Sequence, residues 1–219
     1  MKFESIAIDG PSGAGKSTVA KALADRLHFE YLDTGAMYRA ITWGLLQEQV
    51  DVNREGDVKN ALPTLEVTVK NHHTYVNGQA VDDYIRTPEI TRAVSPVSSY
   101  GAVREKMVAL QREIAKKSNI ILDGRDIGTV VLPNADLKIF LTASPEVRAR
   151  RRLHDEKNTS RETYQEILEN LKKRDDYDSH RKESPLKPAE DSILLESDEM
   201  SLREVVDWIL QQWEKNHAL

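Results

Sequence analysis

Short apolar runs recur along the chain, and segments with helical periodicity separate them. Five of these runs have the length and composition of strands that are buried on both faces: SIAID (5–9), FEYLD (29–33), NIILD (119–123), LKIFL (137–141) and ILLE (193–196). Between them, apolar residues recur every three or four positions, as in 103–114 and in 202–213, where a Ser201/Glu204 capping box precedes the helix. This alternation predicts an α/β fold in which helices cover both faces of a parallel five-stranded sheet.

One region departs from this alternation. The segments LEVTV (65–69) and TYVNGQAV (74–81) alternate between apolar and polar residues at every second position, and the second contains Asn77-Gly78. Because Asn-Gly favours the tight turns of β-hairpins, the pattern predicts antiparallel strands. We therefore expect residues 62–91 to form a small antiparallel insert on the parallel core.

Composition narrows the class of protein. With 219 residues, 39% of them apolar, the chain can bury one sizeable core. A net charge of −5 argues against a general nucleic-acid binder. The sequence contains no cysteine and no apolar run of 18 residues, and the apolar run after its first five residues is too short for a signal peptide. We expect a soluble cytoplasmic monomer with neither a membrane nor a nucleic acid as its partner.

A phosphate-binding motif follows the first predicted strand. Gly10, Gly15, Lys16 and Ser17 match the spacing G-x-x-x-x-G-K-[ST], and a predicted helix follows. In such a loop, backbone N–H groups and the helix N-terminus face phosphate oxygens, the lysine reaches the β- and γ-phosphates, and the serine hydroxyl ligates Mg²⁺. The motif predicts binding of a nucleoside triphosphate, with Mg²⁺ on Ser17. The expected binding residues are Gly10, Pro11, Ser12, Gly13, Ala14, Gly15, Lys16, Ser17 and Thr18.

Transfer to a second substrate is favoured over hydrolysis. The sequence has no Asn-Lys-x-Asp motif of the kind that GTPases use to bind guanine, and glycine rather than glutamate follows Asp123 at the end of its strand. Three arginine-bearing segments offer a site for an acceptor: DTGAMYR (33–39), DGRDIGT (123–129) and RDDYDSHR (174–181). The first two follow predicted strands, where the carboxyl ends of a parallel sheet collect ligands.

Each arginine segment also has a plainer interpretation. Arg39 lies in a predicted helix and could form a surface salt bridge, while 123–126 could be an ordinary turn and 174–181 the charged end of a helix. The run RARRR (148–152) would normally be a solvated charged face. In an acidic protein, we interpret it instead as a lid over the transferring phosphates.

Together, these segments resemble the bacterial cytidylate kinases of the nucleoside monophosphate kinase family. The matching motifs are GPSGAGKST (10–18), YLDTGAMYRA (31–40), DGRDIGTVV (123–131), KIFLTAS (138–144), RARRR (148–152), and RDDYDSHR (174–181) followed by SPL. The resemblance spans essentially the whole chain. It implies a P-loop three-layer fold and the reaction ATP + CMP ⇌ ADP + CDP, with dCMP as a second acceptor.

The resemblance also implies a division of the chain. Residues 1–34, 92–147 and 166–219 would form the P-loop core. Residues 35–91 would form the flap that binds the nucleoside monophosphate, including the insert at 62–91. Residues 148–165 would form a short lid.

Site residues follow from the same resemblance, position by position. The acceptor phosphate and sugar would contact Thr34, Tyr38, Arg39, Asp126 and Arg181, with Arg125 in the same site. The cytosine ring would lie near Ser95, Arg104 and Asp123. Thr34 stands where some members have serine, which preserves the hydroxyl. The expected catalytic residues are Lys16, Arg148, Arg152 and Arg174, and the roles within the arginine run stay open.

Two alternatives remain at this stage. One is a P-loop kinase for another small acceptor, such as UMP, dTMP or a metabolite. The other is a nucleotide-binding regulator that does not turn over, although the presence of Lys16, Asp126 and Arg174 argues against it. The preference between CMP and dCMP cannot be derived from the residues.

Overall fold

The computed structural model describes residues 3–155 and 162–217. The chain divides into two compact units, which are described separately. The core unit comprises Met1–Leu32 and Ile114–Leu219, and the inserted unit comprises Asp33–Glu113. The finer division expected from the sequence stays a prediction, and residues 156–161 of the expected lid lie outside the described part.

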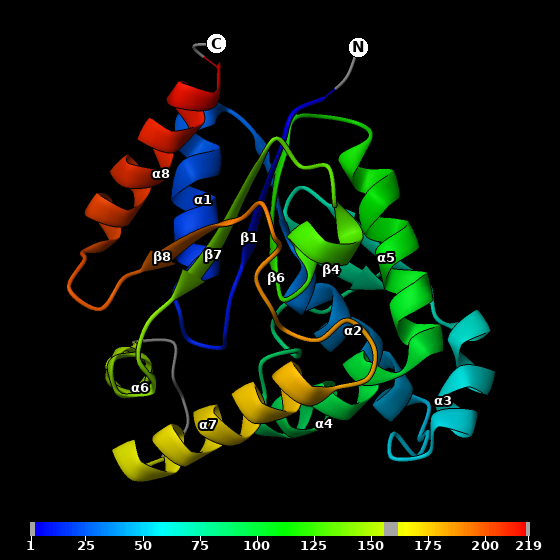
Figure 1. Cartoon of the computed structure of the whole chain (residues 1–219). Coiled ribbons are helices and arrows are strands. Elements are labelled where there is room, and N and C mark those ends of the chain that lie inside the picture. Colours follow the sequence, from blue (N-terminus) through cyan, green and yellow to red (C-terminus); the bar gives the residue numbers. More distant parts are fainter. Residues whose placement is uncertain (1–2, 156–161, 218–219) are drawn as a thin grey trace. The chain divides into compact units, whose positions relative to one another are not determined.

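A five-stranded sheet forms the centre of the core unit (Figure 1). Its strand order is β2-β6-β1-β7-β8, and β1 pairs in parallel with both β6 and β7. The strands are β1 (Ser5–Asp9), β2 (Glu30–Asp33), β6 (Ile120–Gly124), β7 (Leu137–Thr142) and β8 (Ile193–Glu196). All five correspond to the apolar runs seen in the sequence, which confirms the predicted fold class.

Two helices cover one face of this sheet. α1 (Lys16–Leu27) and α8 (Leu202–His217) lie side by side in Figure 1. A single buried cluster joins side chains from the sheet, such as Ile6 and Ile139, to Leu23 of α1 and Ile209 of α8. The predicted capping box is present before α8, because the hydroxyl of Ser201 accepts from the N–H of Glu204, whose carboxylate accepts in return from the Ser201 N–H.

Three further helical elements complete the core unit. α6 (Pro145–Leu153) and α7 (Tyr164–His180) pack together through the small apolar cluster of Ala149, Ile167, Leu168 and Leu171. A π-helical segment, η2 (Ile127–Val131), follows β6 directly. α7 runs without a break through residues 175–178, so Arg174 lies on the helix and Arg181 is the residue that caps its C-terminus.

The inserted unit combines helices with the small antiparallel sheet. Its helical elements are α2 (Thr34–Gln47), α3 (Glu55–Ala61), η1 (Leu62–Thr64), α4 (Pro88–Ser99) and α5 (Gly101–Ala115), the last two residues of which belong to the core unit. Its strands are β3 (Val67–Lys70), β4 (His73–Val76) and β5 (Gln79–Ala80), in the order β3-β4-β5. This confirms the predicted antiparallel insert.

Two tight turns connect the strands of this antiparallel sheet. Asn77 and Gly78 have φ values of 49° and 81°, as the predicted hairpin requires. A second turn at Asn71 and His72, with φ of 49° and 63°, joins β3 to β4 and is not part of the sequence prediction. α2 packs closely here, because a Cβ on Gly44 would lie 2.9 Å from the Leu65 side chain. Within the described ranges, no helix has the length and apolar character needed to cross a membrane.

Candidate functional site

The loop between β1 and α1 has the backbone geometry of a phosphate cradle. A Cβ at Gly10 would lie 1.9 Å from the carbonyl oxygen of Leu141, so only glycine fits at this position. Gly15 has a φ of 88° and caps the N-terminus of α1, where a side chain would strain the backbone. The loop therefore turns directly into a helix whose first N–H groups have no partner within the helix.

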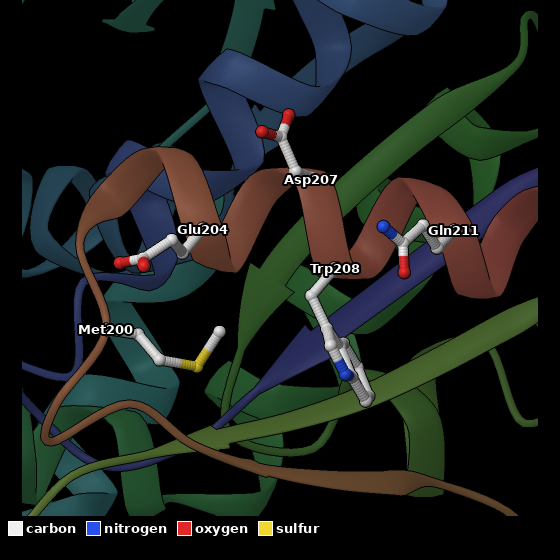
Figure 2. A pocket seen from close by; sticks show the side chains of 5 residues that line it. All are labelled: Met200, Glu204, Asp207, Trp208 and Gln211. Atoms are coloured by element: carbon white, nitrogen blue, oxygen red, sulfur yellow. The ribbon is translucent and has the colours of Figure 1, made fainter.

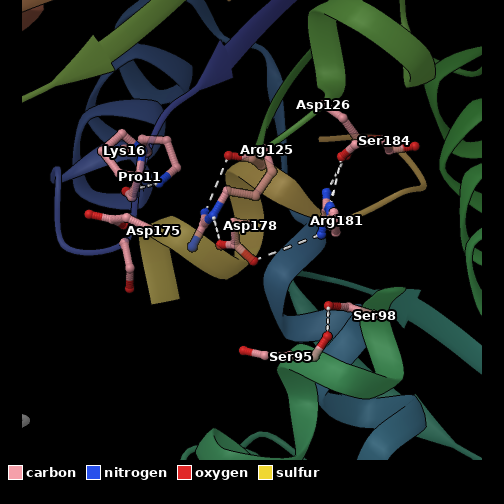
Figure 3. A network of polar contacts seen from close by, with 12 residues as sticks. Pro11, Lys16, Ser95, Ser98, Arg125, Asp126, Asp175, Asp178, Arg181 and Ser184 are labelled. Carbon is pink, nitrogen blue, oxygen red and sulfur yellow. Dashed lines mark hydrogen bonds and ion pairs between the residues drawn. The ribbon is translucent and has the colours of Figure 1, made fainter. Parts of the chain in front are cut away.

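Lys16 is the only lysine of this loop, and it is almost fully buried. Its side chain is 5% exposed, and its Nζ donates a 2.8 Å hydrogen bond to the carbonyl oxygen of Pro11 (Figure 3). Burial, together with the nearby charge of Arg125, lowers the pKa of Lys16 to about 7, although Asp123 and Asp9 oppose the shift. The unliganded loop thus holds a lysine whose cationic form an entering anion would stabilise.

Asp123, the last acidic residue of β6, lies against the P-loop. Its carboxylate accepts a 2.8 Å hydrogen bond from the hydroxyl of Ser17 and another of 2.8 Å from that of Tyr31. The sequence prediction places Asp123 near the cytosine ring, and that role stays a prediction. The observed contacts associate this carboxylate with the predicted metal ligand Ser17 on the donor side. Tyr31 had no predicted role.

A network of ion pairs joins the segment after β6 to the end of α7. Arg125 Nε donates to Asp178 Oδ2 at 2.9 Å, and Arg181 lies 4.0 Å from both Asp126 and Asp178 (Figure 3). Burial would raise the pKa of Asp178, but the charges of Arg125 and Arg174 bring it below its usual range. The structure therefore brings together the predicted residues Arg125, Asp126 and Arg181 around Asp178, which the sequence analysis did not assign.

Arg148 connects the P-loop to α7. The residue is 3% exposed, Nη1 donates to the carbonyl oxygen of Ser12 at 2.8 Å, and Nη2 lies 2.6 Å from Asp175. Arg151 donates to the hydroxyl of Ser197. These contacts rule out a merely solvated charged face for the run at 148–152, whereas the lid role of 148–165 stays a prediction. Arg152 is half-buried on α6, and Arg174 lies on α7.

In the inserted unit, contacts link the predicted residue Arg104 to Tyr38 and, through Ser98, to Ser95. The guanidinium of Arg104 lies 5.4 Å from the centre of the Tyr38 ring, and it donates to the carbonyl oxygen of Ser98. Ser98 in turn donates to the carbonyl oxygen of Ser95. Thr34 is buried at the first position of α2. Arg39 is engaged elsewhere in the unit, with Thr91 Oγ1 at 3.0 Å.

Asp9 is a buried acidic residue that sequence reasoning missed. Its carboxylate accepts from the N–H groups of Ile127 and Gly128 at 2.8 and 2.7 Å. Burial raises the pKa of Asp9 to about 6, and the two hydrogen bonds limit that rise. A lone aspartate at a strand end gives no local signal of such a role, because both partners lie 118 or more positions away.

A shallow pocket lies elsewhere on the core unit, along α8. Met200, Glu204, Asp207, Trp208 and Gln211 line it (Figure 2). None of these five side chains belongs to the predicted site. The predicted site residues of this unit lie instead in the P-loop, after β6, and on or at the end of α6 and α7.

Comparisons with known proteins agree with this geometry. The family model described as "Cytidylate kinase" matches residues 6–215. A cytidylate kinase of Halalkalibacterium halodurans is 46% identical over 215 residues, covering 96% of this chain and 97% of that protein. One of Caldanaerobacter subterraneus is 48% identical over 212 residues, covering 96% and 95%.

A solved structure supports the fold independently. The shikimate kinase of Bacteroides thetaiotaomicron aligns over 99% of both chains with a TM-score of 0.53 and 15% identity, which shows a shared fold alone. The family match over nearly the whole sequence and the two relatives near half identity are far more specific. Taken with a strand–loop–helix that buries Lys16, they show that this chain belongs to the cytidylate kinase family.

Proposed function

We propose that the protein transfers the γ-phosphoryl group of ATP to CMP and dCMP, forming CDP and dCDP. The observation that carries this conclusion is the buried Lys16 in a glycine loop within a chain that matches the cytidylate kinase family from residue 6 to 215. The protein is accordingly an enzyme, a nucleoside monophosphate kinase whose co-substrate is ATP. Its substrates are small nucleotides.

The donor triphosphate binds in the P-loop, at Gly10 to Thr18. The backbone N–H groups of the loop and the first turn of α1 face the phosphate oxygens. Lys16 exchanges its hydrogen bond with Pro11 for contacts with the β- and γ-phosphates. Arg174 and Arg152 supply further positive charge, and Arg148 supports the loop through the carbonyl of Ser12.

Mg²⁺ fits beside Ser17 and Asp123. A hydroxyl and a carboxylate are the hard oxygen ligands that this ion prefers, and it is commonly held by one or two carboxylates together with substrate phosphates. The 2.8 Å hydrogen bond between Ser17 at the start of α1 and Asp123 at the end of β6 shows that the two oxygens are neighbours. We assign Ser17 as a direct ligand and Asp123 as its partner on the donor side. When bound, the ion would neutralise charge on the β- and γ-phosphate oxygens.

Each unit contains residues that we assign to binding of the acceptor nucleotide. In the core unit, these are Arg125, Asp126 and Arg181, which the ion-pair network around Asp178 already orients. In the inserted unit, they are Thr34, Tyr38, Arg39, Ser95 and Arg104. The arginines bind the phosphate as fixed cations, and the buried carboxylate of Asp126 accepts hydrogen bonds from the nucleoside.

Charge neutralisation dominates the chemistry. A phosphate oxygen of CMP attacks the γ-phosphorus in line as the bond to the β-phosphate oxygen breaks, and negative charge spreads over the equatorial oxygens. The attacking oxygen is already anionic near neutral pH, so the reaction requires no general base. Lys16 and the arginines act by holding two mutually repelling anions together and by stabilising the transition state.

No observation favours a non-catalytic regulator or a kinase for another acceptor. A monomeric state and a cytoplasmic location remain predictions from the sequence. The direct test is to incubate the enzyme with MgATP and CMP, and to separate the nucleotides chromatographically. Equimolar CDP and ADP are expected, with little ADP in the absence of CMP. ADP release without CDP would contradict the proposal.

A further inference from the structure

Asp9 lies between the P-loop, which we assign to the donor, and the segment after β6, which we assign to the acceptor. It is the last residue of β1, and Gly10 of the P-loop follows it directly. In the sheet, Asp9 lies opposite Gly124 of β6, one residue before Arg125. Its side chain is 4% exposed, so the carboxylate interacts with protein groups rather than with solvent.

The carboxylate holds one particular stretch of backbone. Oδ1 accepts from the N–H of Ile127 at 2.8 Å, and Oδ2 accepts from the N–H of Gly128 at 2.7 Å. These are the two residues directly after Asp126. Asp126 itself precedes η2 as its N-cap, with φ −145° and ψ 25°. Hydrogen bonds to an ionised acceptor are stronger than neutral ones, so two of them fix the peptide groups that follow Asp126.

The side chain of Lys138 also packs closely against this backbone, at Gly128. A Cβ added to Gly128 would lie 3.1 Å from Cδ of Lys138 and 3.4 Å from Oδ2 of Asp9. Lys138 is itself held by an ion pair of 2.8 Å with Asp191. A side chain at Gly128 would therefore displace the lysine stem or the Asp9 carboxylate by a few tenths of an ångström.

Asp9 interacts electrostatically with Lys16 of the P-loop and with Asp126 of the segment after β6. The charge of Asp126 raises the pKa of Asp9 and that of Lys16 lowers it, in addition to the larger effect of burial and the opposing effect of the two backbone hydrogen bonds. With a pKa of about 6, the carboxyl is ionised near neutral pH and acts only as an acceptor. Because the side chain is 4% exposed and both of its oxygens bind backbone, we assign Asp9 a supporting role rather than a contact with the nucleotide.

We propose that Asp9 is a positioning residue: it ties the 125–128 segment to the P-loop strand, so that the Asp126 carboxylate is held in register with the donor phosphates. This inference rests on the proposed function for the role of Asp126. The inference predicts that loss of the Asp9 carboxylate affects binding of CMP more than binding of MgATP. Lys16 and the P-loop are linked to Asp9 through the chain itself, whereas the position of Asp126 depends on the two hydrogen bonds.

Asp9→Asn tests the claim with almost no change in shape. An asparagine can accept only one of the two N–H groups, and its own NH₂ faces the other donor. We expect the KM for CMP to rise about tenfold or more, because small displacements of positioned groups have large effects on reactivity. The Kd for MgATP should stay within about threefold. Amide hydrogen exchange at Ile127 and Gly128 should accelerate.

Asp136→Asn is the matched control. Asp136 binds the first residue of β1, Ser5, whereas Asp9 is the last residue of that strand. Asp136 accepts from the backbone N–H of Ser5 at 2.9 Å, as Asp9 does from residues 127 and 128. This variant should accelerate exchange at Ser5 and leave the KM for CMP unchanged. Gly128→Ala provides a second perturbation that keeps the Asp9 charge, and it should also raise the KM for CMP.

The outcomes separate the possible explanations. An unchanged KM for CMP in both Asp9→Asn and Gly128→Ala would overturn the inference, even if both variants were less stable. In Asp9→Asn, a rise in the Kd for MgATP equal to the rise in the KM for CMP would overturn it as well. The carboxylate would then act on the P-loop that binds the donor. If the wild-type enzyme did not phosphorylate CMP, the proposed function would fail. Unchanged exchange at residues 127 and 128 in Asp9→Asn would independently refute the anchoring.

Discussion

Lys16 should take up a proton when the triphosphate binds. In the absence of the triphosphate, burial and the charge of Arg125 together lower the pKa of Lys16 to about 7. At pH 8, a group with that pKa is about one tenth protonated. Phosphate oxygens beside the ammonium group favour its charged form and restore a pKa far above 8. Binding at pH 8 should therefore take up about 0.9 proton, and only about 0.1 at pH 6.

Titration calorimetry in buffers of different ionisation enthalpy measures this uptake directly. HEPES, Tris and Tricine at pH 8 should give apparent binding enthalpies that vary linearly with buffer ionisation enthalpy, and the slope counts the protons. The γ-phosphate does not contribute at this pH, because the second pKa of a phosphate group is near 6. By the same linkage, affinity for MgATP should fall about tenfold per pH unit above pH 8.

Two variants show whether the proton binds to Lys16. Lys16→Arg carries a guanidinium that stays charged, and Lys16→Met has no titrating group. Neither should show uptake, whatever its affinity. A wild-type slope below about 0.2 proton at pH 8 would refute the reasoning, because Lys16 would then already be charged in the free enzyme. A slope that persists in the variants would assign the proton to another group.

Three further predictions follow from particular contacts. Asp123→Asn should raise the Mg²⁺ concentration for half-maximal activity by about tenfold or more in a metal titration, because it removes a charged oxygen next to Ser17. Arg148→Met should lower the free energy of unfolding in urea by about 3–5 kcal/mol, because it leaves Asp175 without its buried partner. Burial raises the folded-state pKa of Asp9 from 3.8 to about 6, so its contribution to stability is fully present below pH 3.8 and is lost as the pH rises to about 6. In urea unfolding from pH 4 to 7, the deficit of Asp9→Asn relative to the wild type should shrink with rising pH.

The parallel sheet could be predicted because its signals are local. Each core strand is apolar on both faces, so a short run such as SIAID identifies β1 without knowledge of its neighbours. The turn at Asn77-Gly78 was equally visible, since its residue types favour positive φ. The turn at Asn71-His72 was not, because it lacks the glycine that marks such hairpin turns, although both of its residues adopt positive φ.

Contacts between distant segments explain what the sequence could not predict. Arg148 was expected in a lid, but its hydrogen bond to Ser12 spans 136 positions. Asp178 could be recognised as part of a charged segment, yet its central place among the arginines depends on how the end of α7 lies against the segment after β6. Asp9 gave no signal at all, because its function depends on two backbone groups of η2. Motifs thus predicted which segments matter, while tertiary packing determined which side chain supports which.

The central claim is that this enzyme selects cytidine monophosphates as acceptors. The most direct measurement is kcat/KM for a panel of CMP, dCMP, UMP, dTMP and AMP at saturating MgATP, with ADP release coupled to a spectrophotometric assay. We expect CMP and dCMP to exceed each of the other three by about a hundredfold or more, since a site that hydrogen-bonds one base leaves buried groups unpaired with another. A kcat/KM for UMP, dTMP or AMP equal to or above that for CMP would contradict the account.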